Sequence, residues 1–177
     1  GSGKDGVEEL LQQSSAYIDQ RAIDKKVYPK QIAFNSIPFV DCFLENNYTR
    51  EEMKMVWETH KILDENISVN PTAVRVPVLV GHAESIYIET EKEIDIELAK
   101  NCLNEFAGIS VIDNVQEVDF PTSFEHGHGT DDVYVGRIRK GLSKNNSLNL
   151  WVVADNVRKG AALNSIQIAE NLVGSEM

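Results

Sequence analysis

Hydrophobic and polar positions along this chain repeat with two different periods, and the two periods predict helices and strands in different segments. Apolar residues recur at helical spacing over residues about 5–20, which predicts an amphipathic helix there. A second helix begins at Thr49, because Glu52 three residues later completes a capping box ahead of an apolar stripe. Two more helices are predicted over residues 95–106 and 158–173.

The segments between these helices are rich in β-branched and aromatic residues, as strands are. A strand and loop are predicted for residues 31–39, a loop for 114–130 and a turn for 141–147. Further strands are predicted at 73–80, 84–90, 109–113, 133–139 and 148–154. Strands joined by turns, with helices between them, indicate an α+β domain whose sheet is largely antiparallel or mixed, with helices packed on one face.

Composition narrows the possible functions. The chain has 177 residues and a net charge of −11, which argues against a nucleic-acid or anionic membrane surface as partner. No apolar run approaches the roughly 20 residues of a membrane span, and the polar, acidic start contains no signal peptide. Cys42 and Cys102 have no metal-ligand spacing, and their apolar surroundings predict buried, inert thiols in a reducing cytoplasm. No Gly-rich phosphate loop is present, so the main fold of any nucleotide site would lie outside this chain.

The apolar run that contains Arg75 and His82 is the strongest candidate for chemistry. Arginine suits a bidentate grip on a carboxylate or phosphate, and histidine can move a proton near neutral pH. Seven residues of straight strand would hold the two groups about 23 Å apart, so a shared site requires a bend at Pro77 or Gly81. The alternative is an arginine paired with a surface carboxylate and a histidine with a structural role.

Three further motifs carry both a functional and a structural interpretation. Glu51 and Lys54 lie three residues apart on the capped helix, where they form either an exposed ion pair or a reader of a zwitterionic substrate or phosphate. Asn156 follows the last strand, where an Asp or Asn caps the next helix or meets a ligand. His126 and His128 lack the carboxylate or cysteine partners of a metal site, so we expect no metal and a mobile loop tip there. His60 is expected to be structural.

Several segments together resemble one enzyme family, aspartate-β-semialdehyde dehydrogenase. The segments that carry the resemblance are Ile32–Pro38, Glu51–Lys54, Glu58–Leu63, Arg75–Val78, Gly81–His82, Val135–Arg139 and Leu150–Asn164. The resemblance runs from Gly1 to about Val173 and covers only the C-terminal part of that enzyme, whose fold is similar to the C-terminal domain of glyceraldehyde-3-phosphate dehydrogenase. It implies a substrate-binding and dimerisation domain over 1–157 and a C-terminal helix, 158–177, that packs on an N-terminal NADP-binding Rossmann domain outside this chain. Gly1–Lys4 matches the end of a family Ser-Gly-x-Gly loop and is either native sequence or a tag remnant.

The resemblance also implies a role for each candidate residue. His82 matches the general acid–base, Arg75 the residue that holds the substrate carboxylate, Glu51 the carboxylate that meets the substrate amino group, Lys54 the phosphate-binding cation, and Asn156 a position near the nicotinamide end of NADP. The implied reaction is the NADPH-dependent reductive dephosphorylation of L-aspartyl-4-phosphate to aspartate 4-semialdehyde, in lysine, threonine and methionine biosynthesis, by a homodimer.

The nucleophilic cysteine of the family lies upstream of the matching region, and neither Cys42 nor Cys102 matches it. The isolated chain is therefore expected to be inactive. Two alternatives stay open at this point: a domain similar to N-acetylglutamyl-phosphate reductase, and a dimerisation module without catalysis.

Overall fold

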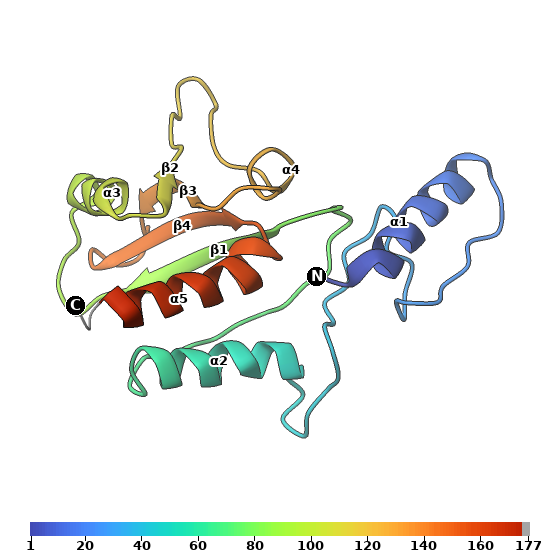
Figure 1. Ribbon diagram of the computed structural model, residues 1–177, viewed down its shortest axis with the longest axis horizontal. Coiled ribbons are helices and arrows are strands. Elements are labelled where there is room, and N and C mark those ends of the chain that lie inside the picture. Colours follow the sequence, from blue (N-terminus) through green and yellow to red (C-terminus); the bar gives the residue numbers. More distant parts are fainter. Residues whose placement is uncertain (175–177) are drawn as a thin grey trace. The chain divides into compact units, whose positions relative to one another are not determined.

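The computed structural model describes residues 1–174, and these fall into two compact units. The N-terminal unit is Ser2–Pro77, and the C-terminal unit begins at Val78 and also includes Gly1. Figure 1 shows the helices of the first unit in blue and cyan and the sheet of the second in green to orange. The sequence predicts a different boundary, at residue 157, beyond which the last helix docks on another domain. That boundary stays a prediction.

The N-terminal unit contains two helices, α1 (Gly3–Ile18) and α2 (Arg50–Ile62). The capping box predicted at the start of α2 is confirmed, because the Thr49 side chain accepts the Glu52 N–H and the Glu52 side chain accepts the Thr49 N–H. The core of this unit forms between α1 and the irregular segment that follows it. Its buried members are Leu10, Ile32, Ala33 and Ile37.

Two buried side chains of α1 hold the irregular segment in place. The Glu9 carboxylate accepts the backbone N–H groups of Lys26 and Val27, and the Gln13 side-chain oxygen accepts those of Ile32 and Ala33. These side chains satisfy backbone donors that a neighbouring strand would otherwise have to satisfy. The loop can therefore be ordered without a sheet.

The strand predicted within 31–39 is wrong for this reason, and the strand predicted at 73–80 does not form either. Only one isolated antiparallel bridge forms between the two segments, with reciprocal backbone hydrogen bonds of 2.9 and 2.8 Å between Ile37 and Arg75. Pro71 and Pro77 flank this bridge and have no N–H to extend it into a ladder.

The C-terminal unit is built on a four-stranded mixed sheet with the order β1-β4-β3-β2, as Figure 1 shows. Its strands are β1 (His82–Glu89), β2 (Ile109–Val111), β3 (Val133–Lys140) and β4 (Ser147–Ala154). The β1–β4 and β3–β4 pairs are antiparallel, whereas β2 and β3 are parallel. The predicted α+β class with a mixed sheet is confirmed.

One face of this sheet packs against α3 (Ile96–Glu105), which begins as predicted at Asp95, whose side chain accepts the Leu98 N–H. Val135, Ile138, Leu148 and Leu150 are buried in the resulting core. On the other face, the predicted loop contains a short helix, α4 (Ser123–His126), and the Trp151 indole donates a 2.9 Å hydrogen bond to the Pro121 carbonyl.

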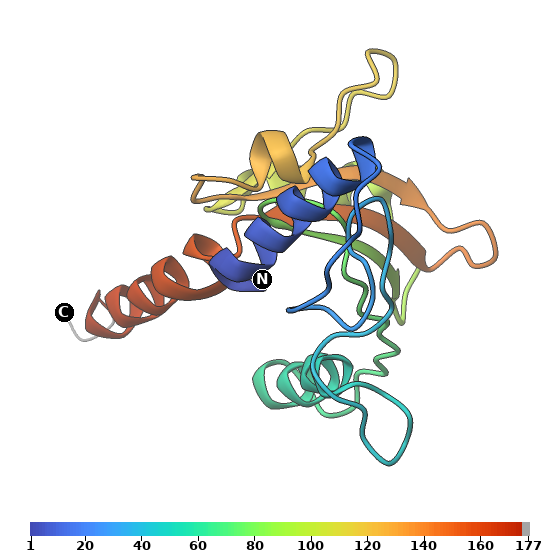
Figure 2. The same ribbon diagram turned by 90° about the vertical axis from the view of Figure 1, so that its right-hand side faces the viewer.

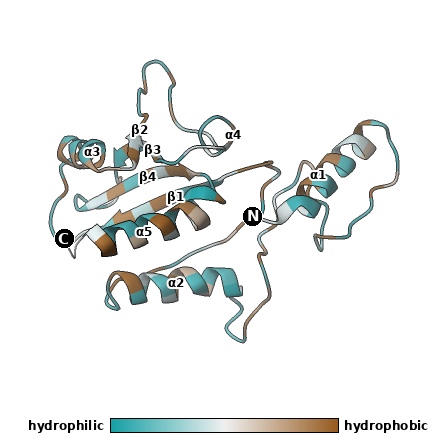
Figure 3. Cartoon of the chain, viewed as in Figure 1, coloured by the Kyte–Doolittle hydropathy of each residue, from teal (hydrophilic) through white to brown (hydrophobic). Residues whose placement is uncertain are grey.

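The predicted C-terminal helix forms in two parts, a π-helical turn η1 (Arg158–Ala162) and the helix α5 (Leu163–Gly174). Figure 2 shows α5 projecting away from the sheet, and the brown bands along it in Figure 3 mark its apolar residues. Ile166, Ile168, Leu172 and Val173 are each more than half exposed, with exposed fractions of 54–65%. An apolar helix face of this kind normally lies against a partner surface.

Candidate active site

Glu51 and Lys54 lie in the first turns of α2 and form an ion pair with 3.1 Å between Oε2 and Nζ. The Glu51 and Lys54 side chains are 39% and 46% exposed, so both remain accessible to a ligand. The hydrogen bond to Glu51 raises the pKa of the Lys54 ammonium above its usual value, and the lysine is therefore charged at neutral pH. The pair presents one negative and one positive group side by side at the start of a helix.

Arg75 belongs to the same unit and is fixed through its backbone. It pairs with Ile37, and two residues earlier the Ala73 N–H donates a 2.9 Å hydrogen bond to the Glu52 carboxylate. Glu52 is buried, and hydrogen bonds from the backbone of Thr49 and Ala73 hold the pKa of its carboxyl below the usual range. The segment that carries Arg75 is thereby fastened to the N-terminus of α2.

The Arg75 side chain itself is half-buried and has no acidic partner within residues 1–174. An exposed surface pair, the structural alternative for this arginine, is therefore not formed. A half-buried guanidinium without a counter-ion is well suited to bind an anion from solution. Sequence reasoning identified Arg75 but missed the bond from Ala73 to Glu52, since a capping box gives no sign of a long-range partner.

His82 is the first residue of β1, where it lies opposite Ala154, the last residue of β4. Its side chain is exposed, and Gly81 before it adopts a φ of +80°, which turns the chain immediately ahead of the strand. Arg75 and His82 belong to different units, so the hypothesis that they face one cleft stays a prediction.

Asn156 and Asp155 lie in the turn after β4. The Asn156 Oδ1 accepts the Gly81 N–H at 3.2 Å, and the buried Asp155 carboxylate accepts the N–H groups of Gly129, Val157 and Arg158 at 2.7–2.8 Å. Burial raises the pKa of the Asp155 carboxyl, but these three hydrogen bonds outweigh it and hold that pKa below the usual range. Asp155 therefore caps the turn, as expected for this position. The Asn156 side chain forms a hydrogen bond with Gly81, the residue that precedes His82.

Comparison with known proteins identifies the family. Residues 1–159 match the sequence profile of the semialdehyde dehydrogenase dimerisation domain. The chain belongs to this family. The aspartate-semialdehyde dehydrogenase of Shewanella violacea is 55% identical over 174 residues, which are 98% of this chain and 51% of that protein. The chain thus spans about half the length of the curated relatives it matches.

Solved structures of aspartate-semialdehyde dehydrogenases have the same fold. That of aspartate semialdehyde dehydrogenase II from Vibrio cholerae, complexed with ASA, has a TM-score of 0.92 at 48% identity and aligns with 98% of this chain and 51% of its own. The enzyme from Candida albicans with NADP has a TM-score of 0.65 at 26% identity and aligns with 80% of this chain and 45% of its own.

The cysteines of this semialdehyde dehydrogenase domain differ from expectation. Cys42 and Cys102 are both exposed and unbonded, so the prediction that they are buried is wrong. Cys42 lies on irregular backbone, where its sequence neighbours do not enclose its side chain. Cys102 lies on the outer side of α3, whereas its neighbours Ala99 and Leu103 pack against the sheet. An exposed thiol can react with reagents, and the prediction that neither cysteine is the catalytic nucleophile stays a prediction.

Two of the remaining histidines of the domain, His60 and His126, have structural contacts. The His126 Nδ1 accepts the Thr122 N–H at 3.2 Å, and its ring lies 5.1 Å from that of Tyr134. His60 Nε2 lies 2.9 Å from the Ile67 carbonyl oxygen, in agreement with the structural role expected for it. Within residues 1–174, no group of three or more His, Cys, Asp or Glu side chains could hold a metal, and no helix has the length and apolar character needed to span a bilayer.

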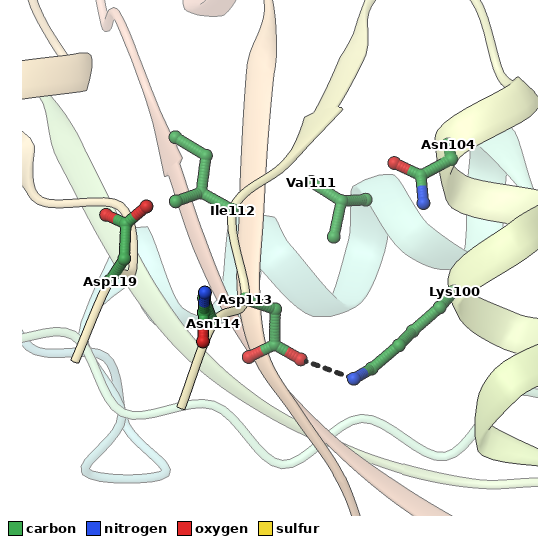
Figure 4. A pocket seen from close by; sticks show the side chains of 7 residues that line it. All are labelled: Lys100, Asn104, Val111, Ile112, Asp113, Asn114 and Asp119. Carbon is green, nitrogen blue, oxygen red and sulfur yellow. Dashed lines mark ion pairs between the residues drawn. The ribbon is translucent and has the colours of Figure 1, made fainter. Parts of the chain in front are cut away.

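A separate pocket of about 460 Å³ lies beside β2, and none of the predicted site residues lines it. Figure 4 shows its main feature, an ion pair of 2.9 Å between Lys100 on α3 and Asp113. The Asp113 carboxylate is 4% exposed and has no well-aligned hydrogen-bond donor among the described residues. Lys100 is therefore its main electrostatic compensation, and the pair ties α3 to the segment that follows β2.

Proposed function

We propose that the full-length protein is an NADP-dependent aspartate-semialdehyde dehydrogenase, which reductively dephosphorylates L-aspartyl-4-phosphate to L-aspartate 4-semialdehyde. The observation that supports this most directly is the group of charges in the N-terminal unit: the Glu51–Lys54 pair together with Arg75, which has no acidic partner in residues 1–174. The substrate has complementary groups, namely an ammonium, a carboxylate and a phosphate.

Each of these side chains has a distinct task in the proposal. Arg75 binds the substrate α-carboxylate with its planar fork, Glu51 accepts from the substrate ammonium, and Lys54 binds phosphate. The role of Glu51 favours aspartyl phosphate over N-acetylglutamyl phosphate, because an acetylated amine has no positive charge to pair with a carboxylate. Substrate choice therefore tests Glu51 directly.

His82 is the proposed general acid–base. Its imidazole nitrogen holds and moves the proton that is exchanged as the substrate carbonyl is attacked and released. The attacking nucleophile, a cysteine in this family, is not supplied by Cys42 or Cys102 in the proposal. It belongs to the half of the enzyme that this chain does not include, and the isolated chain is therefore inactive.

NADP is the proposed cofactor, and Asn156 is the proposed residue of this chain near its nicotinamide end. The Asn156 side-chain nitrogen has no hydrogen-bond partner among the described residues, which leaves both of its N–H donors available, and either fits the oxygen of a carboxamide. When bound, NADPH supplies the hydride. Most of its binding site belongs to the proposed N-terminal Rossmann domain.

The same proposal includes the assembly. The enzyme is a homodimer built through this dimerisation domain, and the exposed apolar face of α5 packs on the Rossmann domain of the full-length chain. It works in the cytoplasm, where its free thiols stay reduced. Sedimentation of the full-length protein at micromolar concentration should give a dimer, and a monomer would contradict this assembly.

The proposal is tested by kinetics of the full-length enzyme, in which formation of NADPH from semialdehyde, phosphate and NADP is measured. Arg75→Lys should raise KM for the semialdehyde about 10-fold or more with a small change in kcat, because a lysine cannot reproduce the bidentate fork. Arg139→Lys, an exposed arginine on β3, is the matched control and should leave both parameters unchanged. Absence of turnover with the semialdehyde, or turnover with N-acetylglutamate semialdehyde instead, would refute the proposal.

A further inference from the structure

Three segments that are distant in sequence meet immediately ahead of His82, all within the C-terminal unit. They are the turn at Gly81, the loop that contains Gly127 and Gly129, and the turn at Asp155 and Asn156. We call these five residues the His82 turn junction. His82 itself lies opposite Ala154, so the two neighbours of the β1–β4 end pair, Gly81 and Asp155, both belong to the junction.

In the first contact of the junction, the backbones of Gly81 and Gly127 pack against each other. A Cβ added at Gly81 would lie 2.7 Å from the Gly127 carbonyl oxygen and 3.0 Å from the Gly127 Cα. A Cβ added at Gly127 would lie 3.2 Å from the Gly81 Cα and 2.6 Å from the Ser123 carbonyl oxygen. Neither position has room for a side chain, so the two glycines pack directly on each other.

Two side chains join the remaining sides of the junction. Asp155 is 5% exposed and accepts the Gly129 N–H at 2.7 Å, which ties the histidine-containing loop to the end of β4. Asn156 accepts the Gly81 N–H at 3.2 Å, which ties the turn before β1 to the same place. Gly81, Gly127, Gly129, Asp155 and Asn156 therefore form a closed circuit of contacts beside His82.

We infer that Asn156 is a positioning residue for His82, and that it acts by holding the Gly81 turn in the His82 turn junction. The direction in which the chain enters β1 depends on the left-handed conformation of Gly81, whose φ is +80°. The bond from Asn156 satisfies the one backbone donor of that glycine and fixes the Val80–Gly81 peptide, so it holds the turn from which the chain continues to His82. This inference rests on the proposed function, because it assumes that His82 performs acid–base catalysis.

The experiment compares three variants in the full-length enzyme. Asn156→Ala removes the acceptor of the Gly81 N–H and should lower kcat about 10- to 100-fold, the range expected for a displaced catalytic group. KM for the semialdehyde should stay within about twofold. Asn156→Asp keeps an acceptor oxygen and should restore kcat to within about threefold of wild type. The dissociation constant of NADP, measured by isothermal titration in the absence of turnover, should rise no more than about threefold in Asn156→Ala, which is the loss of one carboxamide contact and is smaller than the fall in kcat.

Gly127→Ala tests the junction without touching Asn156. Its Cβ would crowd Ser123 and Gly81, so kcat should fall with little change in KM. The Tm of every variant is measured. If Asn156→Ala does not fold, Asn156→Ser is used in its place, because the serine side chain is too short for its oxygen to reach the Gly81 N–H.

The outcomes separate the two proposals. If His82→Asn abolishes turnover while Asn156→Ala keeps a normal kcat, the positioning role is refuted and the proposed function stands. If Asn156→Ala weakens NADP binding and leaves kcat unchanged, Asn156 is a cofactor contact only, which also refutes it. If His82→Asn keeps normal turnover, the proposed acid–base role fails and the inference fails with it.

Discussion

Replacing Glu52 should destabilise the N-terminal unit and loosen the segment that carries Arg75. The buried Glu52 carboxylate accepts the Thr49 N–H at 2.7 Å and the Ala73 N–H at 2.9 Å. Glu52→Ala removes both acceptors at once. Leaving a buried donor unsatisfied costs about 1–3 kcal/mol, and Ala73 is only half-buried, so we expect a total loss of about 2–4 kcal/mol.

The assay is urea unfolding of the chain, followed by the fluorescence of Trp57 on α2 and by circular dichroism. Glu52→Gln should lose about 1–2 kcal/mol, because an amide offers one acceptor oxygen for two donors. Glu65→Gln, at an exposed site in the same unit, is the matched control and should change the free energy of unfolding by less than about 0.5 kcal/mol. A Glu52→Ala variant as stable as wild type would refute this account of the capping box.

The pH dependence of unfolding gives a second test of the same residue. Hydrogen bonds to the backbone of Thr49 and Ala73 lower the pKa of Glu52 in the folded state. The stabilisation by Glu52 is therefore fully present above the unfolded pKa of about 4.3 and is lost as the pH falls through the lower folded pKa. Wild type and Glu52→Gln should converge in stability below that range, and a constant difference down to pH 2 would contradict the assignment.

Three further predictions concern other parts of the chain. Lys100→Met should cost about 3–5 kcal/mol in urea unfolding because it leaves the buried Asp113 uncompensated, whereas Lys100→Met combined with Asp113→Leu should cost much less; equal losses would contradict this. The isolated chain should show no NADP-linked turnover, and turnover that disappears on mutation of Cys42 would refute our interpretation of that thiol. In a dilute sample of the isolated chain, amide hydrogens of residues 163–173 should exchange faster than those of the sheet, and equal protection in a monomer would argue against an unpartnered α5.

Local sequence signals predicted those parts of the fold that local interactions determine. The capping box at Thr49 and the Asp95 cap each specify a helix start within four residues, and both helices begin as predicted. Strand β3 was also predicted, from its alternating pattern, and β4 from its strongly apolar run, which agrees with its burial on both faces. These predicted helices and strands were sufficient to predict the α+β class of the domain.

The predicted strands at 31–39 and 73–80 failed because the decisive interactions are long-range. Glu9 and Gln13 satisfy backbone donors up to 20 residues away, and no property of an apolar run indicates that a helix side chain will do this. The π-helical start of the last helix was missed for a similar reason, since it follows the cap formed by Asp155.

The candidate site shows the same division between local and long-range information. The Glu51–Lys54 pair was predictable from a three-residue spacing on a helix. Arg75 and His82 were candidates from their side-chain chemistry, and only their specific roles toward the substrate came from the family resemblance. The contact between Gly81 and Gly127 joins positions 46 residues apart and involves no side chain, so neither composition nor periodicity could reveal it. In the sequence, Gly127 is distinguished only by its position between two histidines.

The two proposed roles, substrate binding by Arg75 and proton transfer by His82, depend on the same kind of structural support. Glu52 fastens the Arg75 segment and Asp155 fastens the loop beside the His82 turn, and each is a buried carboxylate that accepts several backbone N–H groups. Such a carboxylate can order irregular backbone that no strand reaches, which lets a site be built on loops without losing precision. The two supports lie in different units, so damage to them should be separable: we expect loss of Glu52 to act on Arg75, the proposed anion-binding residue, and therefore on KM, and loss of Asp155 to act on His82, the proposed acid–base, and therefore on kcat.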